Sequence, residues 1–451
     1  MDHAKQLGQE SITKLLIKFS VPAVVGMLVN SLYNIVDRIF VGRGVDSLAI
    51  AGITIGFPIM LITIAFAMLI GMGATSLISI RLGEQKQEEA ELIAGNATVL
   101  LLIISIVISA LGLIFLYPML KLLGASPQVL PYAAEYMSIV LLGTVVAGIG
   151  MGMNNFIRAE GNPKMAMYTM IIGAIVNIIL DYIFIFPLGM GIRGAAAATV
   201  ISQGVSALWV LYYYWSGHSL IKIRVSNLRL EPGVVKTIMA VGMPMFVLQL
   251  TNSLQQLILN KSLGFYGGDT AIAAMGIIFS IVTLVVMPIV GINQGAQPII
   301  GYNYGARQYD RVKEAVKTAL MAATTILIIG FLLTRFFPGP IIALFNQTDY
   351  ELLKVGAYGL TIFTLLIPVV GIQIVGSGYF QAVGKYRQAL VLSLSRQVLL
   401  FIPALLIFPC FLGLNGIWIT APFADLGSAL ISGVWLYREL IIKKEGSLVG
   451  S

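Results

Sequence analysis

Charge, histidine and cysteine are all scarce in this sequence. Of its 451 residues only 11% are Asp, Glu, Lys or Arg, well below the roughly 25% of an ordinary soluble domain. The single cysteine, Cys410, has no partner for an internal disulfide, and neither of the two histidines, His3 and His218, lies inside a long apolar run. A metal or haem cofactor is therefore not expected, because such groups need several Cys or His ligands.

Motifs for nucleotide binding and catalysis are missing as well. No G-x-x-x-x-G-K-[ST] phosphate loop occurs, and the nearest approach, "AVGKY" at 382–386, lacks the first glycine and the final hydroxyl. There is no H-E-x-x-H or G-x-S-x-G sequence and no pair of histidines within an apolar run. These absences exclude a pump with its own ATP site and argue against an enzyme. Any energy that the protein uses must come from an ion gradient.

Long apolar runs dominate what is present. Hydrophobic residues make up 58% of the chain, and its mean hydropathy is +0.92. Each run is long enough to cross about 30 Å of hydrocarbon as a helix. Because the runs are continuously apolar rather than alternating, helices are favoured over a membrane β-barrel. The prediction is an all-α polytopic membrane protein with twelve transmembrane helices near residues 14–40, 48–80, 92–117, 130–156, 165–187, 194–215, 235–264, 271–301, 315–337, 352–380, 387–410 and 415–441.

Basic residues are placed unevenly between these runs. With both termini inside, the inner segments hold 21 of the 28 Lys and Arg residues, with Arg396 included in that count. The positive-inside rule then places both termini in the cytoplasm, as an even number of spans requires. In this setting the net charge of +8 sets orientation in the membrane and does not indicate a nucleic-acid partner. Residues 445–451 are expected to be a disordered tail or a cloning remnant.

The chain repeats itself at one nearly constant offset. "PAVVGMLVNSL" at 22–32 parallels "PMFVLQLTNSL" at 244–254, so Pro22 corresponds to Pro244. The distance in sequence between these two prolines is called here the repeat offset. Because transporters are often built from repeats, we expect two pseudo-symmetric six-helix lobes at 1–215 and 235–444, joined by a cytoplasmic loop at 216–234. Two further stretches match at the repeat offset or one position beyond it, and they pair Gly73 with Gly295, Gly83 with Gly305, Ala159 with Ala382 and Gly161 with Gly384.

An even number of helices makes both lobes run in the same direction, so a site between them can be opened to either side by rocking. Pro22 and Pro244 fall at the same place in the first helix of each lobe and are predicted hinges. Ordinary close packing is the alternative for either proline.

One aspartate stands deep inside an apolar run. In "NIILDYIFIF" at 177–186, Asp181 follows Asn177 by one helical turn, so both lie on one helix face. A carboxylate beside an amide carbonyl offers hard oxygen ligands for Na⁺. Burial among Ile and Phe disfavours the charged form, which suits proton binding. Either property serves coupling to a gradient. The alternative is a carboxyl group that only hydrogen-bonds a neighbouring helix.

Three other acids lie within spans or at their ends. Asp37 is either a site residue or a surface partner of Arg38 or Arg43. Asp425 is either a second-lobe site or a packing hydrogen bond, and Glu135 is expected at the membrane interface.

Several stretches together resemble the multidrug and toxic compound extrusion (MATE) family. They are "NSLYNIVDRIFVG" at 30–42, "RAEGNPK" at 158–164, and "NIILDYIFIF" followed by "GIRGAAAATVIS" at 191–202. The similarity runs along essentially the whole chain and is strongest to the bacterial branch that contains MepA-like and DinF-like exporters. It implies a multidrug antiporter in a bacterial cytoplasmic membrane.

The resemblance also implies the site residues. A cation or proton site in the first lobe would use Asp37, Asn177, Asp181 and Thr199, with Na⁺ or H⁺ as the coupling ion. Another bacterial branch carries acids on helices 7 and 10, where this chain offers Gln255, Gln256 and Gln373, so the first lobe is expected to hold the coupling site. A drug cavity would be lined by Asn30, Tyr33, Asn154, Met170 and Ser202.

The leading hypothesis is a monomeric antiporter that exports cationic or amphipathic compounds by alternating access, in contact with membrane lipid. The runner-up is a flippase for a lipid-linked saccharide or similar amphipathic cargo. A first lobe lined with Arg and Lys would favour the flippase, and the spans hold almost none. A passive channel or a receptor is disfavoured by the repeat and by the isolated buried acids.

Overall fold

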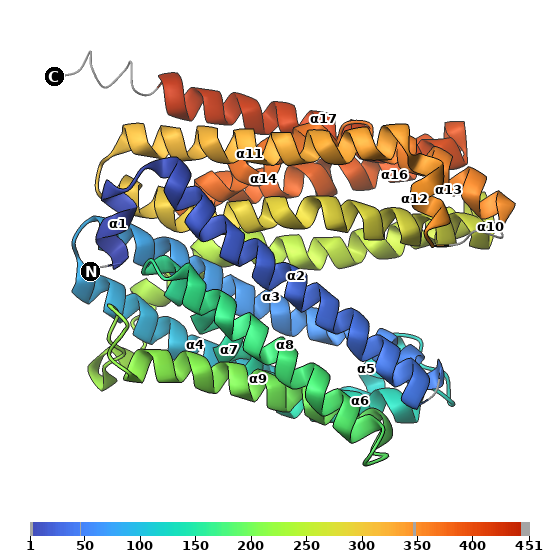
Figure 1. Ribbon diagram of the computed structural model, residues 1–451, viewed down its shortest axis with the longest axis horizontal. Helices are drawn as coiled ribbons and strands as arrows, with labels where there is room; N and C mark the ends of the chain where they lie inside the picture. The colour runs from blue at the N-terminus through green and yellow to red at the C-terminus, as the bar shows by residue number, and fades with distance from the viewer. Residues whose placement is uncertain (1–2, 46, 346–348, 443–451) are drawn as a thin grey trace.

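The described part of the protein is a bundle of long apolar helices that lie roughly side by side (Figure 1). The computed structural model describes residues 3–45, 47–345 and 349–442, and this part of the chain contains helices and no strand. Nine of its helices are long and apolar enough to span, and two bent helix pairs each form one further span. The longest helix holds two spans, which brings the number to the twelve predicted.

The first six spans occupy residues 12–215. A short helix, α1 (His3–Gln9), precedes them, and α5 (Leu116–Leu122) follows the third. The fourth span is bent by 54° near Gly143, a feature that the apolar pattern did not predict. The six spans are α2 (Ile12–Gly44), α3 (Ser47–Gly83), α4 (Gln87–Ile114), the pair α6 (Leu130–Leu142) and α7 (Thr144–Ala159), α8 (Pro163–Ile185) and α9 (Gly191–Trp215).

The second six spans follow a loop with one 3-10 turn, η1 (Val225–Leu228). Helix α10 (Pro232–Gly305) contains two of them, because Gly268 adopts φ 63° and breaks the helix there. The remaining elements are α11 (Tyr309–Phe336), the short α12 (Pro338–Ala343), the pair α13 (Tyr350–Phe363) and α14 (Ile367–Ala382) bent by 51°, the span formed by α15 (Tyr386–Leu394), the π-helical η2 (Ser395–Phe401) and α16 (Ile402–Leu412), then α17 (Leu414–Tyr437) and η3 (Arg438–Ile442).

The repeat predicted from the sequence appears as reciprocal contacts between the two halves. A Cβ atom on Gly83 would lie 2.0 Å from the carbonyl oxygen of Tyr302, and one on Gly305 would lie 2.1 Å from that of Ile80. The repeat offset relates the two glycines to each other, and it relates the two carbonyls in the same way. Glycine lets the two backbones approach this closely, as at other transmembrane helix crossings.

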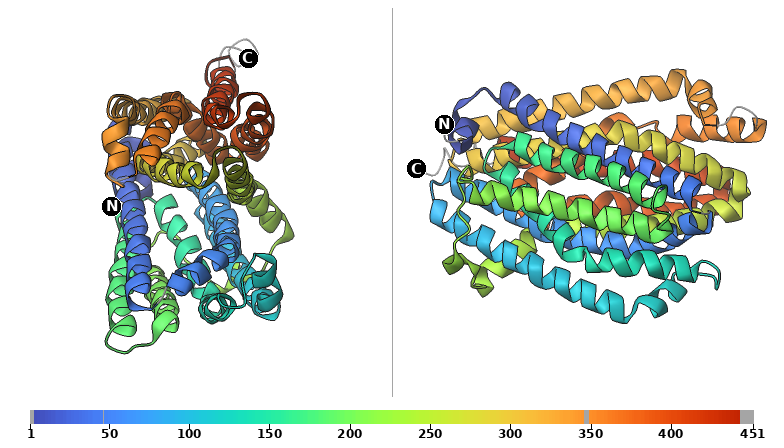
Figure 2. Two further views of the ribbon diagram at one scale, coloured as in Figure 1. Left: turned by 90° about the vertical axis from the view of Figure 1, so that its right-hand side faces the viewer. Right: turned by 60° about the horizontal axis from the view of Figure 1, so that its bottom comes forward.

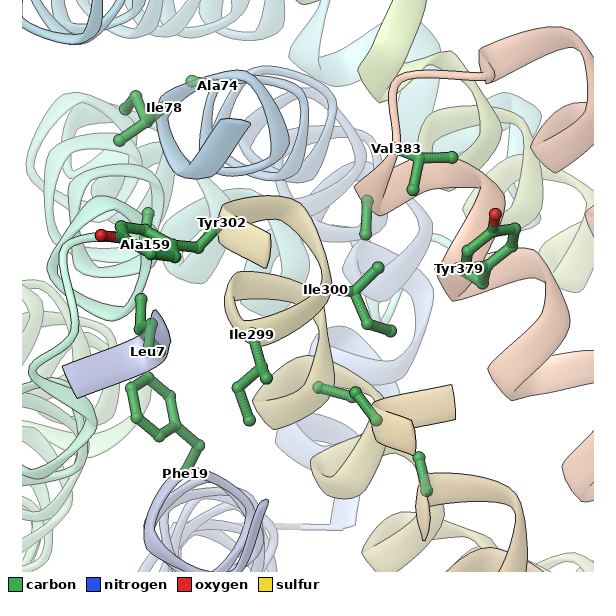
Figure 3. Packing of buried hydrophobic residues seen from close by; sticks show 14 of the residues in the cluster. Leu7, Phe19, Ala74, Ile78, Ala159, Ile299, Ile300, Tyr302, Tyr379 and Val383 are labelled. Atoms are coloured by element: carbon green, nitrogen blue, oxygen red, sulfur yellow. The ribbon is translucent and has the colours of Figure 1, made fainter. Parts of the chain in front are cut away.

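Among the described residues, the core that the two halves share lies at one end of the molecule, the end that holds α1 and the last turn of α17, called here the terminal end. One cluster there joins residues of both halves, including Leu7, Phe19, Ile299 and Tyr302 (Figure 3). Two further clusters lie in one half each, one drawn from residues 41–196 and the other from 259–424. Figure 1 accordingly shows the halves converging at the terminal end and separating toward the opposite end, and the left view of Figure 2 looks onto that opposite end.

Helix α1 crosses from the first half onto the second. The Asn303 side chain donates to the carbonyl oxygen of Leu7 at 2.9 Å, and Arg311 donates to the carbonyls of Leu7 and Glu10 at 3.0 and 2.7 Å. Leu7 itself is fully buried. These bonds tie the start of the chain to α10 and α11 and reinforce the closure of the terminal end.

The loop between the halves is attached to the first half. The carboxyl group of Glu160, just after α7, accepts hydrogen bonds from the Ser219 hydroxyl at 2.7 Å and from the amides of Leu220 and Ile221 at 2.9 and 3.2 Å. Asn96 of α4 accepts from the amide of Glu231 at 2.7 Å. The loop therefore moves with the first half. The predicted tail, 445–451, lies outside the described residues.

Glu160 makes this attachment sensitive to pH. Burial raises the pKa of its carboxyl to about 7 from 4.5, against opposing hydrogen bonds from Tyr213, Ser219 and the loop amides. Because the pKa is raised in the folded protein, the protonated carboxyl stabilises the folded state. This contribution is fully present below about pH 4.5 and is lost as the pH rises through about 7. We expect the purified protein to lose about 1 kcal/mol of stability between pH 6 and pH 8 through this group.

The Glu160→Gln variant should remove that loss, since the amide keeps an accepting oxygen and does not ionise. The measurement is the thermal midpoint of both proteins across this pH range. Parallel pH profiles for the two would show that Glu160 is not the responsible group.

Candidate functional site

Helix α8 carries the two polar residues that the sequence singles out. It begins where Asn162 caps the amide of Met165 and Pro163 occupies the first turn. Asn177 and Asp181 then lie one turn apart and are 1% and 0% exposed. Both polar side-chain atoms of Asn177 and both carboxyl oxygens of Asp181 are buried with no hydrogen bond from any described residue. Such groups are costly to bury unless a ligand or proton satisfies them.

Asp37 approaches this pair from α2, which packs along α8. It is 8% exposed, so it is buried and does not stand in water as one interpretation of the sequence had it. Its carboxyl group interacts electrostatically with that of Asp181. Two carboxylates this close repel each other unless a proton or a cation lies between them. The side chain of Arg38 lies outside the described part of the structure.

Thr199 completes the predicted set from α9, and the structure adds one residue that sequence reasoning missed. Tyr136 of α6 is buried, interacts with Asp37 and Asp181, and brings its hydroxyl within hydrogen-bonding reach of Thr199. The spacing in the sequence could not reveal Tyr136, because nothing in "EYMSIV" links the fourth span to the fifth. Four helices thus meet at one buried polar cluster, which we call the acid site: Asp37, Tyr136, Asn177, Asp181 and Thr199.

The acid site offers only oxygen and nitrogen ligands of hard character. Two carboxyl groups, one amide and two hydroxyls suit a proton shared between the acids or a small cation such as Na⁺. Among the described residues no three His, Cys, Asp or Glu side chains gather in a group that could hold a metal ion. Oxygen ligands of this kind suit a proton or a hard cation better than a soft transition metal.

Four of the five residues predicted to line a drug cavity lie on α2, α8 and α9, which also carry the acid site, and the fifth, Asn154, lies on α7. Met170 of α8 packs on Gly26 of α2, where an added Cβ would lie 2.6 Å from the sulfur. Asn154 of α7 donates to the carbonyl of Ala166 at 3.2 Å, and the Ser202 hydroxyl donates to that of Thr199 at 2.8 Å. Asn30 is exposed and Tyr33 is half-buried on α2. Their part in substrate binding stays a prediction.

The other acids of the spans belong elsewhere. Arg396 donates from Nε to Asp425 at 2.7 Å across the second half, which supports the packing interpretation of Asp425. Arg396 was counted among the cytoplasmic cations, but it lies inside a span, in the π-helical turn of η2. Glu135 pairs with Arg193 at 2.8 Å, and both are exposed, as expected of an interface.

Both predicted hinges lie inside helices. Pro22 is buried in α2 and Pro244 is buried in α10, near the terminal end. Each removes one backbone hydrogen bond at equivalent places in the two halves. Their hinge role stays a prediction.

Comparison with known proteins gives consistent matches along the chain. The profile of the MatE family matches residues 22–183 and again 244–406, so the two matches begin at the same two prolines that define the repeat offset. The multidrug export protein MepA of Staphylococcus haemolyticus (strain JCSC1435) is 27% identical over 98% of this chain and 97% of its own length.

Solved structures match equally well. The MATE multidrug transporter DinF-BH, solved in complex with a ligand, is 41% identical, with a TM-score of 0.90 over 96% of this chain and 98% of its own. A MATE transporter in the bent conformation is 26% identical, with a TM-score of 0.93 over 99% of both chains.

Proposed function

The chain belongs to the MatE family of membrane transporters, and on that premise we propose that it is a secondary active multidrug exporter that exchanges cationic or amphipathic compounds for Na⁺ or H⁺. Relatives named as multidrug export proteins cover nearly its full length. The ligand-bound complex of DinF-BH, a multidrug transporter of the same family, supports a small-molecule substrate. The proposed location is a bacterial cytoplasmic membrane, with the protein acting as a monomer surrounded by lipid.

The observation that carries the coupling proposal is the set of unsatisfied polar atoms on Asn177 and Asp181, with Asp37 beside them. A proton or Na⁺ bound there would relieve the repulsion between the two carboxyl groups and satisfy the buried oxygens. Release of the ion would leave two negative charges on one side of the first half. A cationic substrate would then be attracted to the same helices, so ion and drug would compete for negative charge.

Alternating access is supported by where the halves share their core. With both termini in the cytoplasm, as the basic residues suggest, the terminal end faces the cytoplasm. The structure then corresponds to a state closed inside and separated outside. A ligand shifts the equilibrium between two conformations only if it binds one of them more tightly than the other. The ion, bound from the outside, and the substrate, bound from the inside, would therefore each need to favour a different arrangement of the two halves.

The proposal is tested in bacterial cells that lack their own multidrug exporters. Cells that express the chain should accumulate less of a fluorescent cationic dye than cells with an empty vector, and an ionophore that collapses the ion gradients should abolish the difference. Dye accumulation equal to that of the vector control, together with translocation of a labelled lipid-linked saccharide, would establish the flippase instead.

A further inference from the structure

A surface groove of about 520 Å³ runs between α14 and α17, away from the acid site. Nearly all of its lining is apolar, with two residues from α14 and the rest from α17 and the residue that follows it. The lining consists of Val369, Ile372, Leu426, Ala429, Leu430, Gly433, Val434, Tyr437 and Arg438.

The groove faces the bilayer. Leu426, Leu430, Gly433 and Tyr437 are spaced by four, three and four residues, so they form one stripe of α17. This helix is a membrane span, and Leu430 is 61% exposed within it. Figure 1 places α17 on the side of the second half that is remote from the first half. Hydrocarbon therefore covers this stripe rather than water or the other half.

Gly433 keeps the groove open. A Cβ atom at this position would meet only Ile372, at 4.0 Å. By contrast, Gly376 on the facing helix has Leu436 at 3.1 Å from its ideal Cβ position, so the two helices are in tight contact behind the groove. A side chain larger than glycine at 433 would project into the space between Ile372 and the α17 stripe.

Arg438 stands at the terminal end of the groove with its charge exposed. It takes part in none of the ion pairs found among the described residues. The neighbouring acid, Glu439, is instead paired with Lys385 from the start of α15. A guanidinium group at this level matches the phosphate of a lipid headgroup in geometry and in charge.

The length of the groove along α17 is close to the thickness of one leaflet of the bilayer. Leu426 and Arg438 are twelve residues apart, which is about 18 Å along a helix. Half of the hydrocarbon thickness of a bilayer is about 15 Å. We propose that this groove binds one phospholipid with an anionic headgroup, its acyl chain lying along the α17 stripe past Gly433 and its phosphate on Arg438.

The test is native mass spectrometry of the purified protein given equal amounts of phosphatidylglycerol and phosphatidylethanolamine with identical acyl chains. The wild type should retain one lipid with about a fivefold preference for the anionic one, the size of a single basic contact with a headgroup. Arg438→Gln should still retain a lipid without that preference. Gly433→Leu, which fills the groove, should retain neither phosphatidylglycerol nor phosphatidylethanolamine.

Two variants serve as matched controls. Lys164→Gln removes an exposed cation from the first turn of α8, and Gly276→Leu adds a side chain in α10 at a glycine with nothing within 4 Å of its ideal Cβ position. Both should bind lipid as the wild type does. Thermal midpoints provide a second readout, because added phosphatidylglycerol should raise that of the wild type and not that of Gly433→Leu.

Two results would overturn the proposal. One is a headgroup preference that is the same in the wild type and in Arg438→Gln. The other is a lipid-free dimer that Gly433→Leu converts to a monomer, because a second copy of the chain would then be the occupant. Neither outcome depends on whether the protein transports drugs.

Discussion

Replacing Asp181 by asparagine is expected to abolish gradient-driven export of a cationic dye while the protein still folds and reaches the membrane. The asparagine side chain has nearly the same shape, so the packing around the fully buried position should persist. It cannot release a proton, and it removes one of the two negative charges that would hold a cation beside Asp37. The gradient-dependent part of transport should fall about tenfold or more, as expected when a contact worth more than about 1.4 kcal/mol is lost.

Asp425→Asn is the matched control for this experiment. Asp425 is equally a buried acid of a span, but it is paired with Arg396 at 2.7 Å and lies in the second half. Loss of its charge leaves the arginine without that partner, so the thermal midpoint should fall, while dye export should still respond to the gradient. Coupled export that survives in Asp181→Asn and disappears in Asp425→Asn would move the coupling site to the second half.

Substituting Gly242 by valine is expected to prevent the terminal end from closing and so to stop transport. A Cβ atom on Gly242 would lie 1.7 Å from the carbonyl oxygen of Leu69 on α3, far inside contact distance. Because the obstacle is backbone, no rotamer change relieves it. The two halves would have to separate where they now share a core, which favours the arrangement that is open at this end.

The separation can be measured by thiol labelling. In a Cys410→Ser background, a cysteine replacing Gln294 reports on the terminal end, since Gln294 hydrogen-bonds Arg158 across the halves. Gly242→Val should increase its labelling by a water-soluble thiol reagent and reduce dye export. Gly233→Val, nine residues earlier on α10 with nothing within 4 Å of its ideal Cβ position, should change neither. Normal export by Gly242→Val would show that closure of this end is not needed.

Much of the fold follows from local sequence. Continuous apolar runs predict twelve spans, because each run must satisfy its backbone within one helix to cross hydrocarbon. The repeat offset predicts the pseudo-symmetry, and Gly83 and Gly305 meet their counterparts' carbonyls as that symmetry requires. The bends near Gly143 and before α14 were not predicted. Hydropathy measures the composition of a run and does not respond to the angle between its two parts.

In the candidate site, too, local sequence predicts some of the residues and not the others. Helical spacing alone joined Asn177 to Asp181, since residues four apart share a face. Asp37 and Thr199 came from family resemblance, and Tyr136 came only from the structure, because contacts between helices leave no periodic signal within either helix. For Arg396 the prediction from the sequence was wrong. This basic residue was counted as cytoplasmic although it falls inside the predicted span 387–410, and its charge lies within that span beside Asp425.

The central claim, that the acid site couples an ion gradient to export, is tested most directly with purified protein in sealed vesicles. Dye movement is followed with a Na⁺ gradient alone, with a pH gradient alone and with neither. We predict that one gradient drives the dye against its own concentration difference, and that Asp181→Asn eliminates this movement under the same conditions. Dye movement that only follows its own concentration difference, at a rate unchanged by either gradient, would contradict the claim.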